Sequence, residues 1–311
     1  MATDLYVDRS IATIIGAVGL ALLLVTWKIR NSKTQKIAIF GWLFSGFYFF
    51  NDTPYYIAND DTVLTIMSAA TLPGSIAIAW WENNCSNSKD RNALYWFRGA
   101  IGAAGLPYLL IAHVPWLTVL AIWFVSWQAC FFLSFAGGEE IHLGTTYVNP
   151  ANGNSIPWEE WTGNKWFLTE EMREHSFHTQ LLSDSGEIGI NFVLACTAIQ
   201  SMIIFVGAIS VLDISWKRRV RALFISLSLI HILNLFRNAG LIWLQLGYPE
   251  WIWLGLNIFD FGHLYASRFV SLFAMFLLAL VLFEMLPRMH KYVLRLLRPI
   301  GFTPAKRKPS D

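Results

Sequence analysis

Long apolar runs separated by short polar stretches make up most of this chain. Several runs come close to the ~20 residues that a helix needs to cross the hydrocarbon core of a bilayer. Tryptophans gather near the ends of these runs, as they do where helices leave a membrane. The pattern predicts an all-α polytopic membrane protein with about seven to eight transmembrane helices. The predicted spans are residues 11–27, 37–50 with 51–58 as an extension, 62–81, 94–112, 116–135, 188–211, 222–246 and 264–286.

Basic residues predict which side of the membrane each connection occupies. Lys and Arg are enriched in cytoplasmic loops, and in this chain they gather in four places. The N-terminus, the acidic turn 52–61 and the long segment 137–187 are then extracytoplasmic. We therefore expect a multi-pass protein of the cell membrane. The basic residues are Lys28, Arg30, Lys33, Lys36, Lys89, Arg91, Lys217, Arg218, Arg219, Arg221, Arg288, Lys291, Arg295, Arg298, Lys306, Arg307 and Lys308.

One predicted span does not fit this orientation. Residues 94–112 leave the cytoplasm, so a full crossing by residues 116–135 would return segment 137–187 to the inside. The basic cluster after residue 211 requires instead that the span 188–211 start outside. We predict that residues 116–135 form an outer-leaflet or re-entrant helix, which leaves seven full spans and one partial span.

A single sizeable polar segment divides the chain into four predicted regions. Residues 1–136 hold the N-terminal transmembrane helices, and residues 137–187 form an extracytoplasmic loop or cap. Residues 188–287 hold the transmembrane helices that carry the candidate chemistry, and residues 288–311 form a basic cytoplasmic tail. The absence of an internal repeat weighs against the inverted-repeat plan of many transporters.

Composition narrows the range of possible functions further. The 311 residues are 55% hydrophobic and 14% charged, with a mean hydropathy of +0.45 and a net charge of +2. Cys85, Cys130 and Cys196 have no paired spacing, so neither a disulfide framework nor a zinc site is predicted. The chain has no phosphate-binding glycine loop and no serine-centred elbow. We expect no metal, no cofactor and no nucleic-acid partner. The first apolar run lacks a cleavage signal and is interpreted as a retained span.

The apolar run 188–211 carries a cluster of polar side chains. These are Cys196, Thr197, Gln200 and Ser201. Unpaired polar groups are costly in hydrocarbon, so this face is predicted to look into the protein. At 1.5 Å per residue, Cys196 is expected about 12 Å below the outer start of its span.

Arg237 is the second candidate functional residue. It is expected about 13 Å below the outer end of the next, antiparallel span. An arginine at mid-membrane costs about 2.5 kcal/mol or more and usually faces a cavity or a partner. Asn234 and Asn238, with His231 further back, complete a polar stripe at helical spacing. The structural alternative is an arginine that snorkels to the interface or bonds backbone carbonyls.

Cys196 is predicted to be a nucleophile only in the company of cations. The thiolate is the attacking form, and apolar surroundings raise the pKa of a thiol. Arg237, together with Arg268 or His263 at the start of the last span, is predicted to reach the same depth and supply positive charge. A cation there also stabilises the oxyanion of a tetrahedral intermediate. Taken alone, Cys196 is typical of an inert buried cysteine.

Histidines offer further candidate chemistry. His263 follows Asp260, so it is either a base oriented by a carboxylate or an interfacial imidazole. His142, His175 and His178 lie in the polar segment. Without a further spaced carboxylate, the pair His175 and His178 is predicted to be solvated and not to bind a metal.

These residues resemble the exosortase/archaeosortase family. The resemblance rests on Ala195-Cys196-Thr197-Ala198-Ile199-Gln200-Ser201, on Leu233-Asn234-Leu235-Phe236-Arg237-Asn238, and on a last span that carries His and Arg and ends in Leu286-Pro287. Arg98 with Leu106-Pro107-Tyr108 also matches the pattern of the family's fourth span. Ala198 is a departure, because glycine is expected after Cys-Thr. The segment 137–187 matches less well.

The resemblance implies a membrane-embedded cysteine enzyme. By resemblance, Cys196 is the nucleophile, Arg237 the first basic partner, and either Arg268 or His263 the third group, with Arg268 favoured. Asn234, Asn238, Thr197 and Gln200 are expected to support the site or bind substrate. Family members process secreted surface proteins whose C-terminus carries a short motif of the Pro-Gly-Phe type, a hydrophobic span and basic residues. The substrate's new C-terminus is then coupled to a membrane lipid.

Two other functions stay open at the level of the sequence. A transporter or channel would use Arg237, Arg268 and Asp260 as an ion pathway. The grouping of these residues at one depth weighs against that interpretation. A lipid-modifying enzyme without a peptide substrate would share the same polar constellation, and only the identity of its substrate would separate it from a transpeptidase.

Overall fold

The computed structural model describes residues 6–29, 31–58, 61–136, 140–184 and 186–301. Arg30 and the tail residues Lys306, Arg307 and Lys308, which the orientation argument uses, lie outside the described residues. The chain divides into two compact units. The first comprises Met1–Pro107, Ile204–Ala222 and Phe283–Asp311, and the second Tyr108–Ile203 and Leu223–Leu282.

The first unit is built from helices of the N-terminal part of the chain. Asp8 caps α1, because its side chain accepts hydrogen bonds from the first backbone N–H groups of the helix. α1 and α2 approach closely at Gly19, where a Cβ would lie 2.6 Å from the backbone nitrogen of Ser45. The helices are α1 (Arg9–Thr26), α2 (Ser32–Phe50), α3 (Thr53–Ala58), α4 (Thr62–Asn84) and most of α5 (Ser88–His113).

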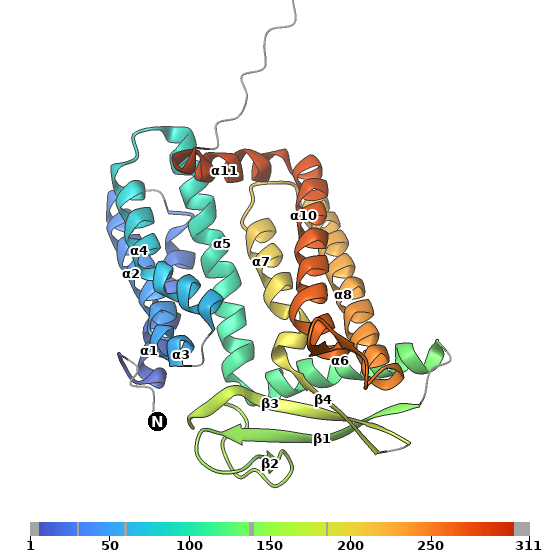
Figure 1. The fold of residues 1–311 in the computed structure, drawn as a ribbon. Coiled ribbons are helices and arrows are strands. Elements are labelled where there is room, and N and C mark those ends of the chain that lie inside the picture. The colour runs from blue at the N-terminus through green and yellow to red at the C-terminus, as the bar shows by residue number, and fades with distance from the viewer. Residues whose placement is uncertain (1–5, 30, 59–60, 137–139, 185, 302–311) are drawn as a thin grey trace, which may run out of the picture. The chain divides into compact units, whose positions relative to one another are not determined.

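A helix near the C-terminus completes this unit. α11 (Pro287–Leu297) runs across the end of α5 (Figure 1). Arg295 of α11 forms an ion pair with Asp90 of α5 at 2.6 Å, and Tyr292 packs on Trp96. The short helix η3 (Arg298–Ile300) follows. The predicted tail therefore begins as a helix that ends at Leu297, because basic and apolar positions alternate there with a helical period.

The second unit contains a β-sheet packed on a helix. Four antiparallel strands lie in the order β2-β1-β3-β4, and α6 (Pro115–Phe135) runs along one face of the sheet (Figure 1). Alternate residues such as Phe177, Leu181 and Phe192 are buried against α6 residues such as Ile122 and Val125. The strands are β1 (Ile141–Pro150), β2 (Ile156–Pro157), β3 (Met172–Ser183) and β4 (Gly186–Val193).

The remaining helices follow the sheet in the chain. Residues Leu194–Thr197 form the 3₁₀ helix η1, which leads into α7 (Ile199–Ser210) and then α8 (Trp216–Gly247). A small hairpin of β5 (Ile252–Trp253) and β6 (Leu256–Asn257) precedes α9 (Ile258–Phe261). A π-helical turn labelled η2 (Gly262–Ala266) then opens α10 (Ser267–Met285).

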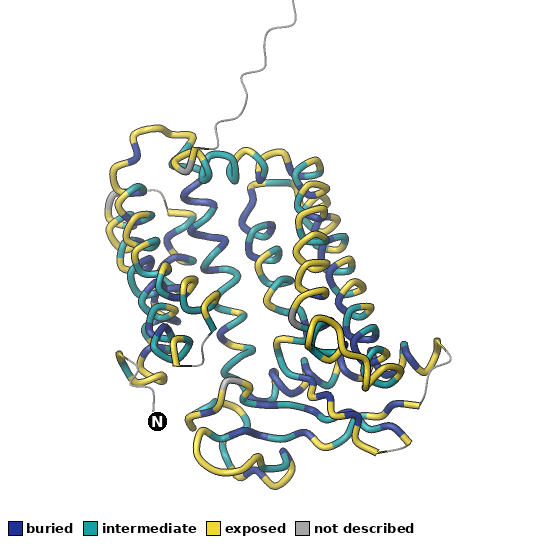
Figure 2. The backbone as a smooth tube through the Cα atoms, viewed as in Figure 1, coloured by how far each residue is buried: buried dark blue, intermediate teal, exposed yellow. Residues whose placement is uncertain are grey.

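The helices identify a multi-pass membrane protein. Within the described residues, six helices are long and apolar enough to cross a bilayer, namely α1, α4, α5, α6, α8 and α10. Much of α10 is exposed (Figure 2). Its exposed side chains include Phe269, Leu272 and Phe276, as expected of a helix that faces lipid. The helical polytopic architecture is thus confirmed. The number of full spans, the orientation and the four predicted region boundaries stay predictions.

Two parts of the sequence-based prediction are corrected. The segment 137–187 is not only a cap loop, because most of its described residues form the sheet. The predicted helical span 188–211 begins as strand β4, and its helix starts only at Ile199. The reason lies in residues 187–192, where exposed Glu187, Gly189 and Asn191 alternate with buried Ile188, Ile190 and Phe192. This period of two is the signature of a strand and not of a helix.

Candidate functional site

Cys196 lies in a tight turn between a strand and a helix. β4 ends at Val193, and η1 carries Cys196 directly ahead of α7. The Thr197 hydroxyl donates to the carbonyl of Leu194 at 2.6 Å and closes the turn. Cys196 is therefore not about two turns inside a helix, as the depth argument supposed. It lies at the point where the chain turns from the sheet into α7.

The backbone conformation of Ala198 shows why glycine would suit the position after Thr197. Its φ is +57°, in the left-handed region, where an L-residue with a Cβ is strained and glycine is not. The turn needs this conformation to end η1 before α7 begins. The departure from the family pattern therefore costs backbone strain, and it leaves every polar group of the turn in place.

Two asparagines of α8 hold the backbone of the Cys196 turn. The carbonyl oxygen of Cys196 accepts a hydrogen bond from Asn234 at 2.8 Å and another from Asn238 at 3.0 Å. Both asparagines are buried and lie one helical turn apart on α8. Buried polar groups are normally satisfied in this way. Their part in the geometry is to fix the position of the cysteine, and neither amide bonds the sulfur.

Arg237 lies on the same stripe of α8. It is half-buried, and its guanidinium donates to the Asn238 side-chain oxygen at 3.3 Å. Among the described residues, no carboxylate forms an ion pair with it. Burial raises the pKa of the Cys196 thiol, while a hydrogen bond with the Val193 backbone and the positive charge of Arg237 lower it. Arg237 is thus the cation that favours the thiolate.

His263 and Arg268 complete the charged surroundings. Burial lowers the pKa of His263, the charges of Arg237 and Arg268 lower it further, and Asp260 acts in the opposite direction. The ring of His263 stacks on Phe259, with centroids 5.8 Å apart. The Asp260 carboxylate is bonded to Asn257 at 2.8 Å, so its effect on His263 is one of charge. Burial and the two arginines therefore favour the neutral form of the imidazole, while Arg268 is exposed at the start of α10.

Gln200 does not join this group. Its amide donates to the Tyr108 hydroxyl at 2.7 Å. Tyr108 was part of the resemblance pattern, but no role was predicted for it. This hydrogen bond joins the first turn of α7 to the end of α5. It therefore supports the Cys196 turn indirectly, through α7.

A pocket of about 500 Å³ opens beside Arg237. Its lining comes mainly from α8 and α10, and it includes Ala198 and Ser201, just after the cysteine. Gly240 faces open space, since no atom lies within 4 Å of the Cβ that a larger residue would carry. Apart from Arg237, Asn234 and a few serines, the lining is apolar. The arrangement suits an apolar segment whose polar end reaches the arginine.

The histidines of the sheet behave differently from one another. His178 is half-buried, its ring stacks on Tyr147, and its Nδ1 lies 2.9 Å from the Asn149 amide. The prediction that it is merely solvated is wrong, because residues at strand centres pack against cross-strand neighbours. His175 is exposed, and its charge contributes to the lowered pKa values of His178 and His263. The alternation of β3 was the sequence signal that could have found this arrangement.

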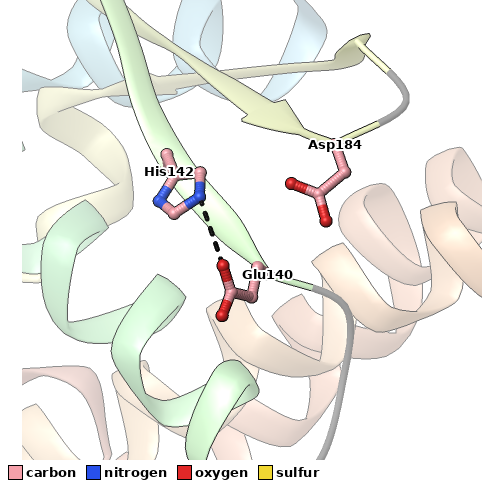
Figure 3. A group of neighbouring side chains, drawn as sticks. All are labelled: Glu140, His142 and Asp184. Atoms are coloured by element: carbon pink, nitrogen blue, oxygen red, sulfur yellow. Dashed lines mark ion pairs between the residues drawn. The ribbon is translucent and has the colours of Figure 1, made fainter.

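A separate polar group lies at the other end of the sheet. Glu140, His142 and Asp184 are all exposed, and their ligand atoms lie within 4.8 Å of one another (Figure 3). His142 and Glu140 approach to 3.8 Å. The three residues sit at the start of β1 and at the β3–β4 turn, whereas Cys196 follows the far end of β4. Exposed carboxylates of this kind are common without an ion, so the group is not part of the candidate site.

Comparison with known proteins supports the resemblance seen in the sequence. Over 206 residues the chain is 21% identical to archaeosortase A from Haloferax volcanii. The chain is similar to archaeosortase A. The matched region covers 66% of this chain and 61% of archaeosortase A, which is less than two thirds of that protein's length. No family model matches the chain, and no solved structure matches it.

Proposed function

We propose that this chain is a membrane-embedded cysteine transpeptidase. The observation that carries the proposal is the Cys196 turn. Two asparagines hold its backbone, Arg237 supplies positive charge to the thiol, and an apolar pocket begins two residues further along. The similarity to archaeosortase A supports the same reaction class. A nucleophilic thiol in apolar surroundings needs such a cation.

The proposed substrate is a secreted surface protein with a C-terminal tripartite signal. Its hydrophobic segment would occupy the pocket between α8 and α10, whose lining is mostly apolar. The scissile peptide would then lie at the Cys196 turn, and the basic end of the signal would remain on the cytoplasmic side. A membrane lipid is the proposed acceptor of the new C-terminus, and the reaction takes place on the extracytoplasmic side. The Pro-Gly-Phe type of motif is carried over from the family resemblance.

The first chemical step forms a thioester on Cys196. The thiolate attacks the peptide carbonyl carbon. Arg237 and Arg268 stabilise the negative charge that develops on the carbonyl oxygen. The C–N bond then breaks, and the leaving amine takes a proton. His263 or a water molecule carries the proton released by the thiol to that amine. The hydrophobic segment departs with the new N-terminus.

The second step transfers the acyl group. A nucleophile on the lipid attacks the thioester carbon, the C–S bond breaks, and the thiol is regenerated with the proton that the nucleophile loses. The positive charges that stabilise the first oxyanion act on the second oxyanion as well. One pocket therefore serves both half-reactions.

The decisive experiment follows a tagged substrate by mass spectrometry. The substrate carries the tripartite tail and is expressed with wild-type enzyme, with Cys196→Ala or with Cys85→Ala. Cys196→Ala is expected to abolish processing, whereas Cys85→Ala removes only a weak S–H contact to the Asn87 carbonyl and is expected to process normally. A lipid-extended C-terminus in the wild type identifies the acceptor. Normal processing by Cys196→Ala would disprove the proposed nucleophile.

A further inference from the structure

β4 is an edge strand that leads directly to the candidate nucleophile. In the sheet order β2-β1-β3-β4 it pairs with β3 alone. Within the described part of the chain, no strand other than β3 and no loop pairs with β4 through backbone hydrogen bonds. Edge strands present a row of unpaired N–H and C=O groups, which natural proteins usually shield with lysine or proline. The β4 sequence, Gly186-Glu187-Ile188-Gly189-Ile190-Asn191-Phe192-Val193, contains neither.

The register shows which residues of β4 face outward. His178 pairs with Val193, Thr179 with Phe192 and Gln180 with Asn191. Backbone groups of successive residues in an antiparallel strand point alternately to one neighbour and the other. Val193 is the N-cap residue of η1, and the carbonyl of an N-cap residue accepts the first hydrogen bond of its helix, so the backbone groups of Val193 point away from β3. Those of Asn191, two residues earlier, point to the same outer edge.

A bulge limits the usable edge to the end nearest Cys196. Gly189 has a φ of +77°, and the β3–β4 register shifts beyond Gln180. A bulge of this kind bends a strand and interrupts pairing. The regular part of the outer edge is therefore Ile190 to Val193, immediately before the turn that carries the cysteine.

The order of features along the chain matches the order of parts in the proposed substrate. The outer edge of β4 comes first, then Cys196, then Ala198 and Ser201, which line the apolar pocket. A tripartite signal presents an extended peptide first, then the scissile bond, then an apolar helix. A peptide laid along β4 would thus bring its scissile carbonyl to the sulfur as its apolar segment enters the pocket.

We propose that the outer edge of β4 binds the extended segment of the substrate by strand addition, with main-chain hydrogen bonds centred on Asn191. This inference rests on the proposed function and specifies how the peptide is recognised. Strand addition draws its affinity from main-chain hydrogen bonds, and side chains supply selectivity at alternate positions. The edge therefore accepts many surface proteins and leaves selectivity to the residues next to the sulfur.

The first test removes one outward N–H group. Asn191→Pro deletes the N–H and fills the edge, whereas Asn191→Ala removes only the exposed side chain and is the matched control. Proline is tolerated at edge positions whose N–H faces solvent. In full-length enzyme, Asn191→Pro is expected to lower kcat/KM for the tripartite substrate about tenfold, the scale of one lost main-chain hydrogen bond, and Asn191→Ala less than about twofold. Equal activity of both variants and the wild type would overturn the inference.

A second test varies the substrate and does not depend on how Asn191→Pro folds. Synthetic substrate peptides carry a single N-methyl group at successive positions before the scissile bond. Strand addition predicts a loss of processing at every second position, because only alternate amides face β4. Uniform losses, or none, would overturn the inference. Cys196→Ala separates the two proposals: if it abolishes processing while the N-methyl series shows no alternation, the transpeptidase stands and strand addition fails.

Discussion

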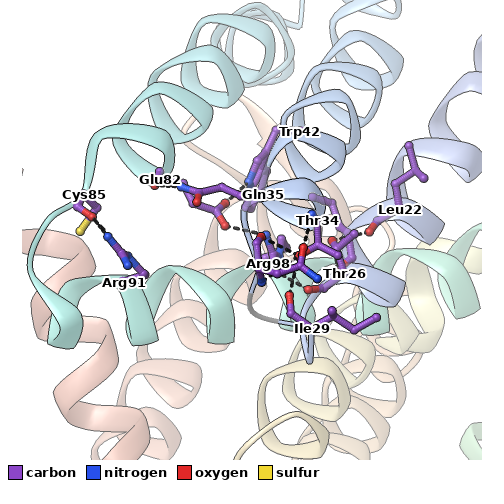
Figure 4. A network of polar contacts seen from close by, with 12 residues as sticks. Leu22, Thr26, Ile29, Thr34, Gln35, Trp42, Glu82, Cys85, Arg91 and Arg98 are labelled. Carbon is purple, nitrogen blue, oxygen red and sulfur yellow. Dashed lines mark hydrogen bonds and ion pairs between the residues drawn. The ribbon is translucent and has the colours of Figure 1, made fainter.

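Arg98 and Arg237 both lie on helices that are apolar enough to cross a membrane, yet their surroundings are opposite in kind. Arg98 belongs to α5 in the first unit and is completely buried. It donates to the Glu82 carboxylate at 2.6 Å and to the Thr26 carbonyl at 2.5 Å (Figure 4). Trp42 donates to the second oxygen of Glu82 at 2.8 Å. The buried charge is thus neutralised and largely hydrogen-bonded.

Arg237 of α8 has no such counter-charge. Its one hydrogen bond in the described structure goes to a neutral amide, and its guanidinium borders the apolar pocket. An unneutralised cation in a half-buried place is costly, and such groups in membranes commonly mark functional sites. A paired arginine holds helices together, whereas an unpaired one beside a thiol and a pocket is available to a substrate. The comparison therefore predicts that Arg98 contributes to stability and that Arg237 contributes to activity.

The largest effect is expected from breaking the Arg98–Glu82 pair. Arg98→Met leaves the Glu82 carboxylate buried without its cation, which is expected to lower the free energy of unfolding by about 3–5 kcal/mol. The double variant Arg98→Met with Glu82→Leu removes both charges and is expected to recover most of that loss. Denaturant unfolding of detergent-solubilised protein measures both. A double variant as unstable as the single one would show that the ion pair is not what the arginine contributes.

Arg237→Gln is expected to lower the activity strongly and the stability little, the opposite of Arg98→Met. Removing a positive donor from a developing oxyanion typically lowers a rate about 100-fold or more, so processing of the tripartite substrate should fall by that scale. The free energy of unfolding should change little, because none of the described carboxylates forms an ion pair with Arg237. Arg237→Lys keeps the charge but loses the fork of donors, and an intermediate rate is expected. Unfolding as severe as that of Arg98→Met would place Arg237 with the structural arginines.

The two arginines also show which contacts can be predicted from the sequence. The stripe of Asn234, Arg237 and Asn238 was predicted because helical period places these residues on one face, and the structure confirms that they share it. Pairing of Arg98 with Glu82 was not predicted, since residues of α4 and α5 meet only through tertiary packing. Sequence spacing identifies neighbours within a helix and not between helices.

The turn at Cys196 marks the other limit. An apolar window of about 20 residues averages a strand and a helix into one predicted span, so the sheet was missed although residues 187–192 alternate. The roles of Asn234 and Asn238 could be predicted only as supporting, because their bonds to the Cys196 carbonyl depend on where that turn lies. The positive φ of Ala198 is likewise a property of the folded turn.

The smallest effect concerns the pH dependence that the unpaired cations impose on His263. Burial, Arg237 and Arg268 together hold its pKa below the usual value of about 6.5. The unfolded chain therefore binds a proton more readily than the folded protein as pH falls below about 6.5, so stability is full above that pH and declines as pH falls towards the lowered folded pKa. Solvent screens the half-exposed ring, which keeps the effect modest.

Titration of the His263 imidazole by NMR in detergent tests whether the unpaired Arg237 and the paired Arg98 differ in their effect on the His263 pKa. Arg237→Gln removes a nearby positive charge, so the pKa of His263 should rise. The decline in stability below about pH 6.5 should then end at a higher pH and be smaller. Arg98→Met is the matched control: Arg98 is neutralised by Glu82 and is not among the charges that act on His263, so the titration should stay where it is. His263→Gln should flatten the pH dependence of unfolding below about 6.5. Equal shifts from both arginine variants would mean that neutralisation by Glu82 is not what distinguishes the first arginine from the second.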